Sequence, residues 1–194
     1  MAHQKIAFIV LLFLTILVKN TIAGGIDSTY LITANSVGYG KIGMKVSEFI
    51  KCIKCDSVDS MYKEDTGWTL YKNKVKILKF GGPNTPKRYF VRGITIFDPL
   101  YRTRKGVHVG MTLEEFNHLY PTIPIHQDIV FRHDESFDFV DLDGKAKNYY
   151  CTLKVGWDNG EPVGIKYEPD KNGEYYSKEY RLDGYISSIS IWKH

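Results

Sequence analysis

The sequence predicts an α+β fold of two tandem units, each a helix packed on an antiparallel β-meander. Two observations predict it: a short internal repeat, and a change from helical to period-two hydrophobic spacing after each copy of that repeat. The chain has 194 residues, of which 43% are hydrophobic and 25% are charged. Because this is ordinary globular usage, the composition excludes a disordered chain and a coiled coil.

The first 23 residues have the pattern of a secretory signal peptide. Lys5 precedes an apolar run over residues 6–18, and Ala23 offers a small-residue cleavage site. A helix over that run would be about 20 Å long, which is shorter than the roughly 30 Å hydrocarbon core of a bilayer. We therefore expect cleavage after Ala23 and a secreted or periplasmic protein without membrane insertion. An uncleaved anchor is the alternative.

The internal repeat divides the rest of the chain. Residues 43–49 match residues 110–116 at a constant offset of 67 positions, and each copy begins with Gly-Met. A repeat of this size is typical of a duplicated supersecondary unit. The predicted units are residues 24–93 and residues 94–194.

A helix is expected directly after each Gly-Met pair. In the second unit Gly110 permits a turn, Thr112 can cap a helix whose N3 residue is Glu115, and Pro121 ends that helix. Apolar residues recur three or four positions apart, as one buried face requires. They are Val46, Phe49, Ile50 and Ile53 in the first helix and Leu113, Phe116 and Tyr120 in the second.

Period-two alternation after each helix predicts the strands of the meanders. The expected strands are residues 67–71, 74–80 and 89–97 in the first unit, and 129–132, 137–142, 149–157, 163–167 and 185–192 in the second. Asp143-Gly144 and Asn159-Gly160 are strong hairpin signals. Antiparallel strands with helices on one face give the α+β pattern.

Three cysteines would remain after cleavage, an odd number for an oxidising compartment. Cys52 and Cys55 are close in sequence at the end of the first helix, so we expect a structural disulfide between them. Cys151 is expected to stay reduced on a buried strand face, and its pairing with one of the other two is the alternative. A redox centre of the thioredoxin type would instead place the C-x-x-C at the start of a helix.

Charge and motifs predict neither catalysis nor nucleic-acid binding. Cleavage would leave a formal net charge of +2, whereas nucleic-acid binding usually requires a strongly basic face. The sequence has no G-x-S-x-G elbow, phosphate-binding glycine loop or H-E-x-x-H. We therefore expect no enzyme activity, no cofactor and no metal.

Two groups of polar residues contain side chains of the types that bind metal ions. Asp141-Leu142-Asp143-Gly144 resembles the start of a calcium loop, but Thr152 stands where the twelfth-position Glu is needed. A set of histidines and acids has spacing that fits no ligand rule, and we expect exposed strand or loop positions for it. The set is His118, His126, His133, Asp128, Asp134 and Glu135.

The order of features resembles a known family. A short apolar run, Gly-Met-Thr, a helix and a meander, duplicated in an exported protein, resemble the β-lactamase inhibitor protein type. A single unit is also similar to the small outer-membrane assembly lipoproteins of the SmpA/OmlA type. The chain departs from both because it lacks a lipid-attachment cysteine and the cysteine pattern of the inhibitors. The matching residues are Val109, Gly110, Met111 and Thr112 and, less well, Ile42, Gly43 and Met44, with Lys45 in place of the Thr.

The resemblance implies protein binding, which the inhibitors achieve with a concave sheet surface. Alternation over residues 185–192 places Ile189 and Ile191 on one side and Trp192 on the other, so Trp192 is the leading candidate anchor. Trp68, Tyr71, Tyr175 and Tyr176 are the secondary candidates. We expect a secreted or periplasmic protein-binding module, such as an inhibitor, with a protein partner of unknown identity. An envelope structural or assembly factor and a small secreted enzyme are the alternatives.

Overall fold

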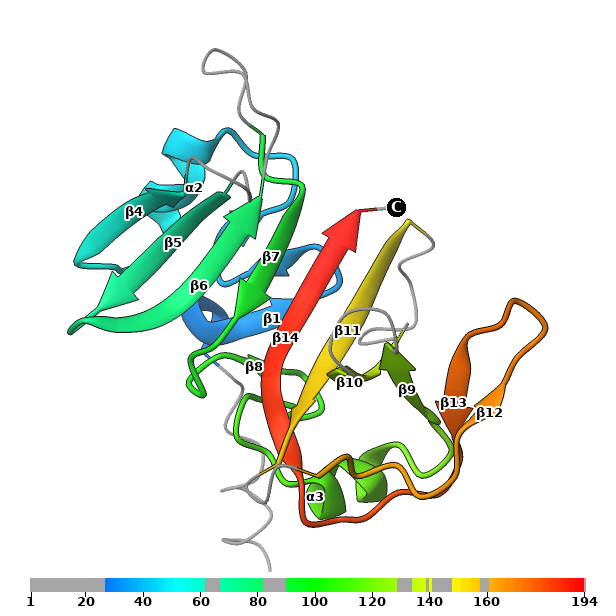
Figure 1. The fold of residues 1–194 in the computed structure, drawn as a ribbon. Coiled ribbons are helices and arrows are strands. Elements are labelled where there is room, and N and C mark those ends of the chain that lie inside the picture. Colours follow the sequence, from blue (N-terminus) through cyan, green and yellow to red (C-terminus); the bar gives the residue numbers. More distant parts are fainter. Residues whose placement is uncertain are drawn as a thin grey trace, which may run out of the picture.

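Strands make up most of the regular structure in the computed structural model (Figure 1). The structure describes residues 27–61, 67–81, 90–128, 134–138, 140, 148–157 and 161–193. In these ranges the strands form two sheets, one of ten strands and one of four. The signal-peptide segment and the Asp141 to Gly144 turn lie outside the described residues.

The ten-stranded sheet is antiparallel and has the order β12-β13-β9-β10-β11-β14-β7-β6-β5-β4. One half consists of β4 (Ser57–Met61), β5 (Gly67–Lys72), β6 (Val75–Gly81) and β7 (Gly93–Ile96). The other half consists of β9 (Ile125–Asp128), β10 (Asp134–Phe137), β11 (Tyr149–Gly156), β12 (Glu168–Pro169), β13 (Tyr175–Ser177) and β14 (Tyr185–Lys193). The two halves join where β7 pairs with β14.

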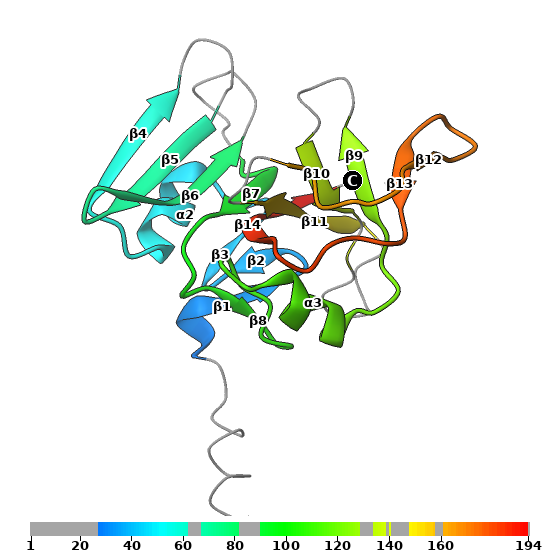
Figure 2. The ribbon, with the colours of Figure 1, turned by 60° about the horizontal axis from the view of Figure 1, so that its bottom comes forward.

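The four-stranded sheet is small and lies to one side. It follows a short 3-10 turn, Ser28–Tyr30, and consists of β1 (Leu31–Thr33), β2 (Ser36–Val37), β3 (Gly40–Lys41) and β8 (Arg102–Thr103). Its order is β3-β2-β1-β8, with β1 and β8 parallel. This sheet and the second helix lie on the same side of the ten-stranded sheet (Figure 2).

The two α-helices begin where the sequence predicts. They are α2 (Val46–Cys52) and α3 (Leu113–Leu119). Thr112 forms a complete capping box with Glu115, in which the threonine hydroxyl accepts from the Glu115 N–H and the Glu115 carboxylate accepts from the Thr112 N–H. Lys45 precedes α2 and makes no side-chain cap.

The two Gly-Met turns make equivalent backbone contacts. The Gly43 N–H donates to the Val91 carbonyl, and the Val91 N–H donates to the Met44 carbonyl. Gly110 and Met111 make the same pair of hydrogen bonds with Ile186. Both glycines have positive φ, 91° and 85°, a conformation that other residues rarely adopt. The first turn is thereby attached to residue 91, just before β7, and the second to β14.

The core lies between the helices, the small sheet and one face of the ten-stranded sheet, which we call the covered face. Phe49 of α2 contacts Phe80 of β6 with ring centroids 4.8 Å apart, and Phe116 of α3 contacts Phe137 of β10 at 4.6 Å. All four rings are fully buried. Apolar side chains that alternate along the strands complete this layer.

The predicted α+β fold of two helix-plus-meander units is wrong. The described chain is mostly β, and each of its α-helices has only seven residues, about two turns. The strands expected in separate meanders form one continuous sheet, and the division expected after residue 93 falls inside β7. The short repeat predicted the positions of the helices correctly, but it carried no information on how the strands that follow them would pair.

The predicted strands agree best with the structure where apolar and polar residues alternate over many positions. The long strands β5, β6, β11 and β14 lie close to their predicted positions. Residues 163–167, predicted as a strand, form an irregular segment, and the strand expected at residues 129–132 lies outside the described residues. The short strands β9 and β13 were missed because three or four residues carry too little alternation to detect.

The three cysteines are free thiols in the structure. Cys151 is buried, and burial raises the pKa of its thiol. Burial, with a smaller contribution from Asp56, also raises the pKa of Cys55. The Cys52–Cys55 disulfide stays a prediction, and non-reducing peptide mapping of the exported protein would check it. Among the described residues, no helix has the length and apolarity needed to span a membrane.

Candidate functional site

The face of the ten-stranded sheet opposite the core, which we call the outer face, is the candidate functional site. The helices and the small sheet pack on the covered face, so within the described ranges no helix or second sheet lies over the outer face (Figures 1 and 2). Alternation along β14 shows the two faces directly. Ile189 and Ile191 are fully buried, whereas Trp192 is 37% exposed.

Trp192 is held flat on a neighbouring strand. It lies opposite Gly93 of β7 in the sheet register, and a Cβ atom on Gly93 would lie 2.1 Å from a carbon of the indole ring. Only glycine leaves room for the ring at this position. An aromatic ring that covers a cross-strand glycine stabilises a sheet where glycine alone would weaken it. The arrangement fixes one face of the indole on the backbone.

A row of polar side chains, four hydroxyls and one lysine, crosses the middle of the outer face. The register places Thr69, Lys79, Thr95, Ser190 and Thr152 side by side on five neighbouring strands. The Thr95 and Ser190 hydroxyl oxygens are 3.0 Å apart and form a hydrogen bond. Thr95, Ser190 and Thr152 are short and partly exposed, so this part of the surface is polar.

A polar cluster lies at the β9–β10–β13 end of the outer face. The His126 ring places Nδ1 2.9 Å from an Asp138 oxygen and Nε2 3.4 Å from a Glu174 oxygen. The Ser136 hydroxyl donates to the other Asp138 oxygen over 2.8 Å. The Tyr176 ring lies 5.0 Å from the His126 ring, and its hydroxyl donates to Glu174. Burial and the nearby Glu174 carboxylate raise the pKa of Tyr176 to about 12, so its phenol remains a donor at neutral pH.

Tyr176 also lines a pocket of ≈ 380 Å³ beside this cluster. The pocket has two prolines, two lysines and three acidic residues at its walls, and Lys166 and Glu168 form an ion pair of 2.6 Å there. The lining residues are Pro124, Lys166, Glu168, Pro169, Asp170, Tyr176, Lys178 and Glu179. Walls of this composition can accept a side chain of a protein partner.

The cluster lacks the arrangement of a nucleophilic triad. In such a triad the serine hydroxyl bonds the imidazole, and the acid orients the imidazole from its other side. Here the Ser136 hydroxyl donates to Asp138, and both ring nitrogens of His126 face carboxylates. No group of three or more histidine, cysteine or acidic side chains in the described ranges is arranged to hold a metal ion.

The sequence-based prediction for Glu135 is wrong. We expected an exposed position, but Glu135 is 0% exposed and lies on the covered face. Its carboxylate accepts from the Val163 N–H (2.7 Å), the Gly164 N–H (2.8 Å) and the Tyr167 hydroxyl. Phe137, two positions further along β10, is also buried. The signal was therefore present, because alternation places residues two apart on the same face.

The Glu135 contacts fix the irregular segment that leads toward β12. A Cβ atom on Gly164 would lie 2.1 Å from the Tyr167 hydroxyl oxygen, so glycine is required for the tyrosine to reach the carboxylate. Burial raises the pKa of Tyr167, and the hydrogen bond to Glu135 raises it further by a smaller amount. A buried carboxylate is tolerated when donors satisfy it. This network attaches residues 163–167 to β10 and has a structural role.

The five predicted partner-binding aromatics divide between the two faces. The register places Trp192, Tyr71 and Tyr176 on the outer face. Trp68 lies on the covered face, half-buried, and stacks on Phe80 with centroids 5.5 Å apart. Tyr175 lies opposite Gln127, next to the buried Glu135, and also belongs to the covered side. The structure therefore brings three of the five to one surface.

Comparison with known proteins gives a likeness of fold. No protein-family model matches the sequence, and no curated protein matches it. Among solved structures, the crystal structure of the uncharacterized protein yfeY from Escherichia coli is similar, with a TM-score of 0.53 and 14% sequence identity. The match covers 84% of this chain and 99% of that chain. At this identity the likeness concerns the fold alone.

Proposed function

We propose that this protein is an exported protein-binding module that holds another protein on its outer face. The observation that carries the proposal is the exposure of Trp192 on the outer face: it is 37% exposed although its strand neighbours Ile189 and Ile191 are fully buried. Large aromatic residues are enriched at protein interfaces and concentrate binding energy there. Tyr71 and Tyr176 extend the same surface toward its two ends.

The rigidity of Trp192 supports this role. Its ring is already fixed over Gly93 in the free protein, so little side-chain freedom remains to be lost when a partner binds. The short hydroxyl side chains of Thr95, Ser190 and Thr152 beside it are partly exposed and can donate and accept hydrogen bonds. An aromatic anchor beside adaptable polar groups is a common composition of recognition surfaces.

Site-specific photo-cross-linking tests the proposal in the natural host. A photoreactive amino acid is placed at Thr95 or Thr152 on the outer face, and at Lys51 or Glu114 on the helices as matched controls. We expect protein cross-links from the two outer-face positions and none of the same mass from the two helix positions. Equal cross-linking from all four positions, or none from the outer face, would contradict the proposal.

Export is part of the proposal and has its own test. The sequence pattern over residues 6–23 supports a cleaved signal peptide. Mass spectrometry of the natural protein should find an N-terminus near Gly24. Recovery of intact Met1 in a membrane fraction would contradict export with cleavage.

A further inference from the structure

We propose that β4, the strand at one edge of the ten-stranded sheet, binds an extended segment of another protein by strand addition, with a Lys or Arg of that segment opposite Asp59. This site is separate from the outer face and goes beyond the function proposed above. Three observations carry the inference: the length of β4 compared with the other edge strands, the exposure of its residues, and the position of Asp59 at its centre.

The two described sheets have four edge strands, and three of them are short. The strands β12, β3 and β8 have two residues each, and they contain Pro169, Lys41 and Arg102. Short length, proline and charged side chains all hinder the pairing of a further strand at an edge. The fourth edge strand, β4, has five residues and contains neither proline nor a basic residue. Of the four, β4 is therefore the edge best suited to accept another strand.

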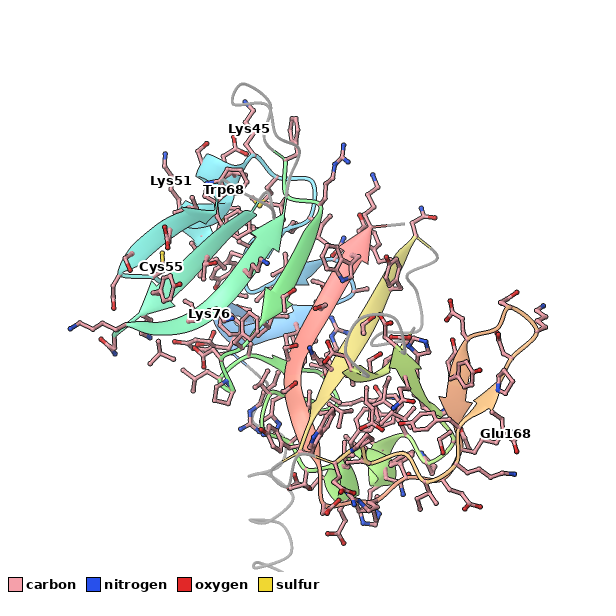
Figure 3. The ribbon with its side chains drawn as sticks, viewed as in Figure 1. Lys45, Lys51, Cys55, Trp68, Lys76 and Glu168 are labelled. Carbon is pink, nitrogen blue, oxygen red and sulfur yellow. The ribbon has the colours of Figure 1, made fainter. Side chains whose placement is uncertain are left out.

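The strand β4 lies at one margin of the ten-stranded sheet. It pairs with β5 through all five residues, and no other strand in the described ranges pairs with it. Figures 1 and 2 show it as the outermost strand, and Figure 3 shows Cys55, just before β4, and Glu168 of β12 at opposite margins. Alternate residues of an antiparallel strand direct their N–H and C=O groups to opposite sides. Part of the β4 backbone therefore faces away from β5, where an extended chain can form ladder hydrogen bonds.

The described side chains of β4 are exposed. They belong to Ser57, Val58 and Asp59, and Val58 is 42% exposed although it is apolar. Val58 lies opposite Leu70, which is fully buried on the covered face. Because cross-strand neighbours lie on the same face, an added strand would place one of its side chains beside Val58. Apolar contact is therefore available to an apolar residue at that position of the segment.

Asp59 defines the charge that the segment should carry. It lies on the outer face, because it is opposite Thr69 in the register. Its carboxylate makes no ion pair or hydrogen bond with any residue that the structure describes. An opposite charge directly across a strand pair stabilises the pairing, and a like charge destabilises it. The edge therefore favours a segment with Lys or Arg opposite Asp59.

A second copy of this chain fits the edge less well. Two β4 strands related by a twofold axis pair antiparallel, and pairing over all five residues places Asp59 opposite Asp59. Residues that face each other must lie on the same face of the sheet, so the register can change only in steps of two residues. One such step leaves only the three residues at one end of each strand paired. Asp59 therefore disfavours self-pairing while it favours a basic segment.

A synthetic peptide with the core Thr-Val-Lys-Val-Thr tests the inference on the exported protein, residues 24–194. Antiparallel pairing can place its Lys opposite Asp59 and a valine opposite Val58. Fluorescence anisotropy should show saturable binding with a dissociation constant below about 1 mM. Hydrogen exchange should become slower at amides of β4 and stay unchanged in β12. No saturable binding up to about 1 mM, or protection that excludes β4, would overturn the inference.

Backbone methylation of the peptide tests the pairing itself. An added strand uses the N–H groups of alternate residues, so N-methylation of one alternate set should abolish binding and methylation of the other set should be tolerated. Equal binding of the two methylated peptides would overturn strand addition, because contacts through side chains alone do not depend on which set is methylated.

Charge reversal tests the position of Asp59. Asp59→Lys should bind the Lys peptide at least about threefold more weakly and should bind the matched Thr-Val-Glu-Val-Thr peptide more tightly than the wild type does. Glu114→Lys on α3 changes the net charge equally and is the control, with both affinities expected to stay within about twofold. If both variants have the same effect, net charge and not the β4 edge determines binding, and the inference fails.

The edge and the outer face can fail separately. Cross-linking from Thr95 and Thr152 reports on the outer face, whereas the peptide experiments report on β4. Sedimentation equilibrium of the exported protein should show no dimer that forms through β4. A dimer with protected β4 amides would identify a second copy as the occupant and would overturn the assignment to a basic segment of another protein.

Discussion

The two faces of the ten-stranded sheet differ although the same strands build them. Along β14, Ile189 and Ile191 are fully buried against the core, while Ser190 and Trp192 point to the outer face. On the covered face the side chains are large and apolar and meet α2, α3 and the small sheet. On the outer face they are mostly hydroxyls, charges and a few aromatics, with no described helix or sheet above them.

This difference separates the sources of stability from the candidate sources of recognition. Burial of apolar area stabilises the fold through the covered face. Most outer-face side chains are polar and at least partly exposed, although Thr69 and Ser188 are buried, so most substitutions there should disturb the fold less. Substitutions on the covered face should therefore change the free energy of unfolding, and substitutions on the outer face should change association.

The largest effect is expected for the helix phenylalanines. Phe49→Ala and Phe116→Ala should each lower the free energy of unfolding by about 3 to 5 kcal/mol, because each removes a fully buried ring that contacts a second ring of the sheet. Chemical denaturation with urea measures the change. Thr152→Ala on the outer face is the control, with an expected change within about 0.5 kcal/mol. A loss below about 1 kcal/mol for either phenylalanine would contradict the division between the faces.

The next largest effect on the free energy of unfolding is expected for Glu135, the buried carboxylate of the covered face. Glu135→Ala should cost about 2 to 4 kcal/mol, because it leaves two N–H groups and the Tyr167 hydroxyl without their acceptor. Glu135→Gln keeps one oxygen acceptor and should cost less. Asp134→Ala, the adjacent acid on the outer face, should change the unfolding free energy by under about 1 kcal/mol, since its ion pair with Lys154 is exposed. Equal losses for Glu135→Ala and Asp134→Ala would refute the structural role of Glu135.

A smaller effect distinguishes the two helix starts. Thr112→Ala should cost about 1 kcal/mol because it removes the capping box of α3. Lys45→Ala occupies the equivalent position before α2, where no side-chain cap exists, and should be nearly neutral. Thermal and urea denaturation of both variants measure the difference. Equal costs would show that the cap contributes nothing beyond the Gly-Met turn that both helices share.

Local features were predictable from the sequence, and long-range pairing was not. The capping box at Thr112, the start of each helix and the alternation that buries Ile189 and Ile191 all depend on residues within one turn or one strand. The joining of β7 to β14 depends on residues about 95 positions apart, and no local pattern specifies it. The fold class was wrong for that reason.

The candidate site was predictable only in part. Alternation placed Trp192 correctly because its strand is nine residues long. Trp68 and Tyr175 were named without an assigned face, and the register places both on the covered side. The His126 cluster depends on β9, β10 and the segment before β13 meeting in space, so its residues could be named from the sequence but not brought together.

The most direct test of the central claim compares two adjacent residues of β14 in two measurements. Trp192→Ala should lower the free energy of unfolding by about 1 to 2 kcal/mol, because the ring covers Gly93, but it should weaken binding of the protein captured by outer-face cross-linking at least about thirtyfold, equivalent to roughly 2 kcal/mol. Ile191→Ala should show the reverse, with a loss of about 2 to 5 kcal/mol in unfolding free energy. Unchanged affinity for Trp192→Ala, or unfolding as severe as that of Ile191→Ala, would contradict the assignment of the outer face as the recognition surface.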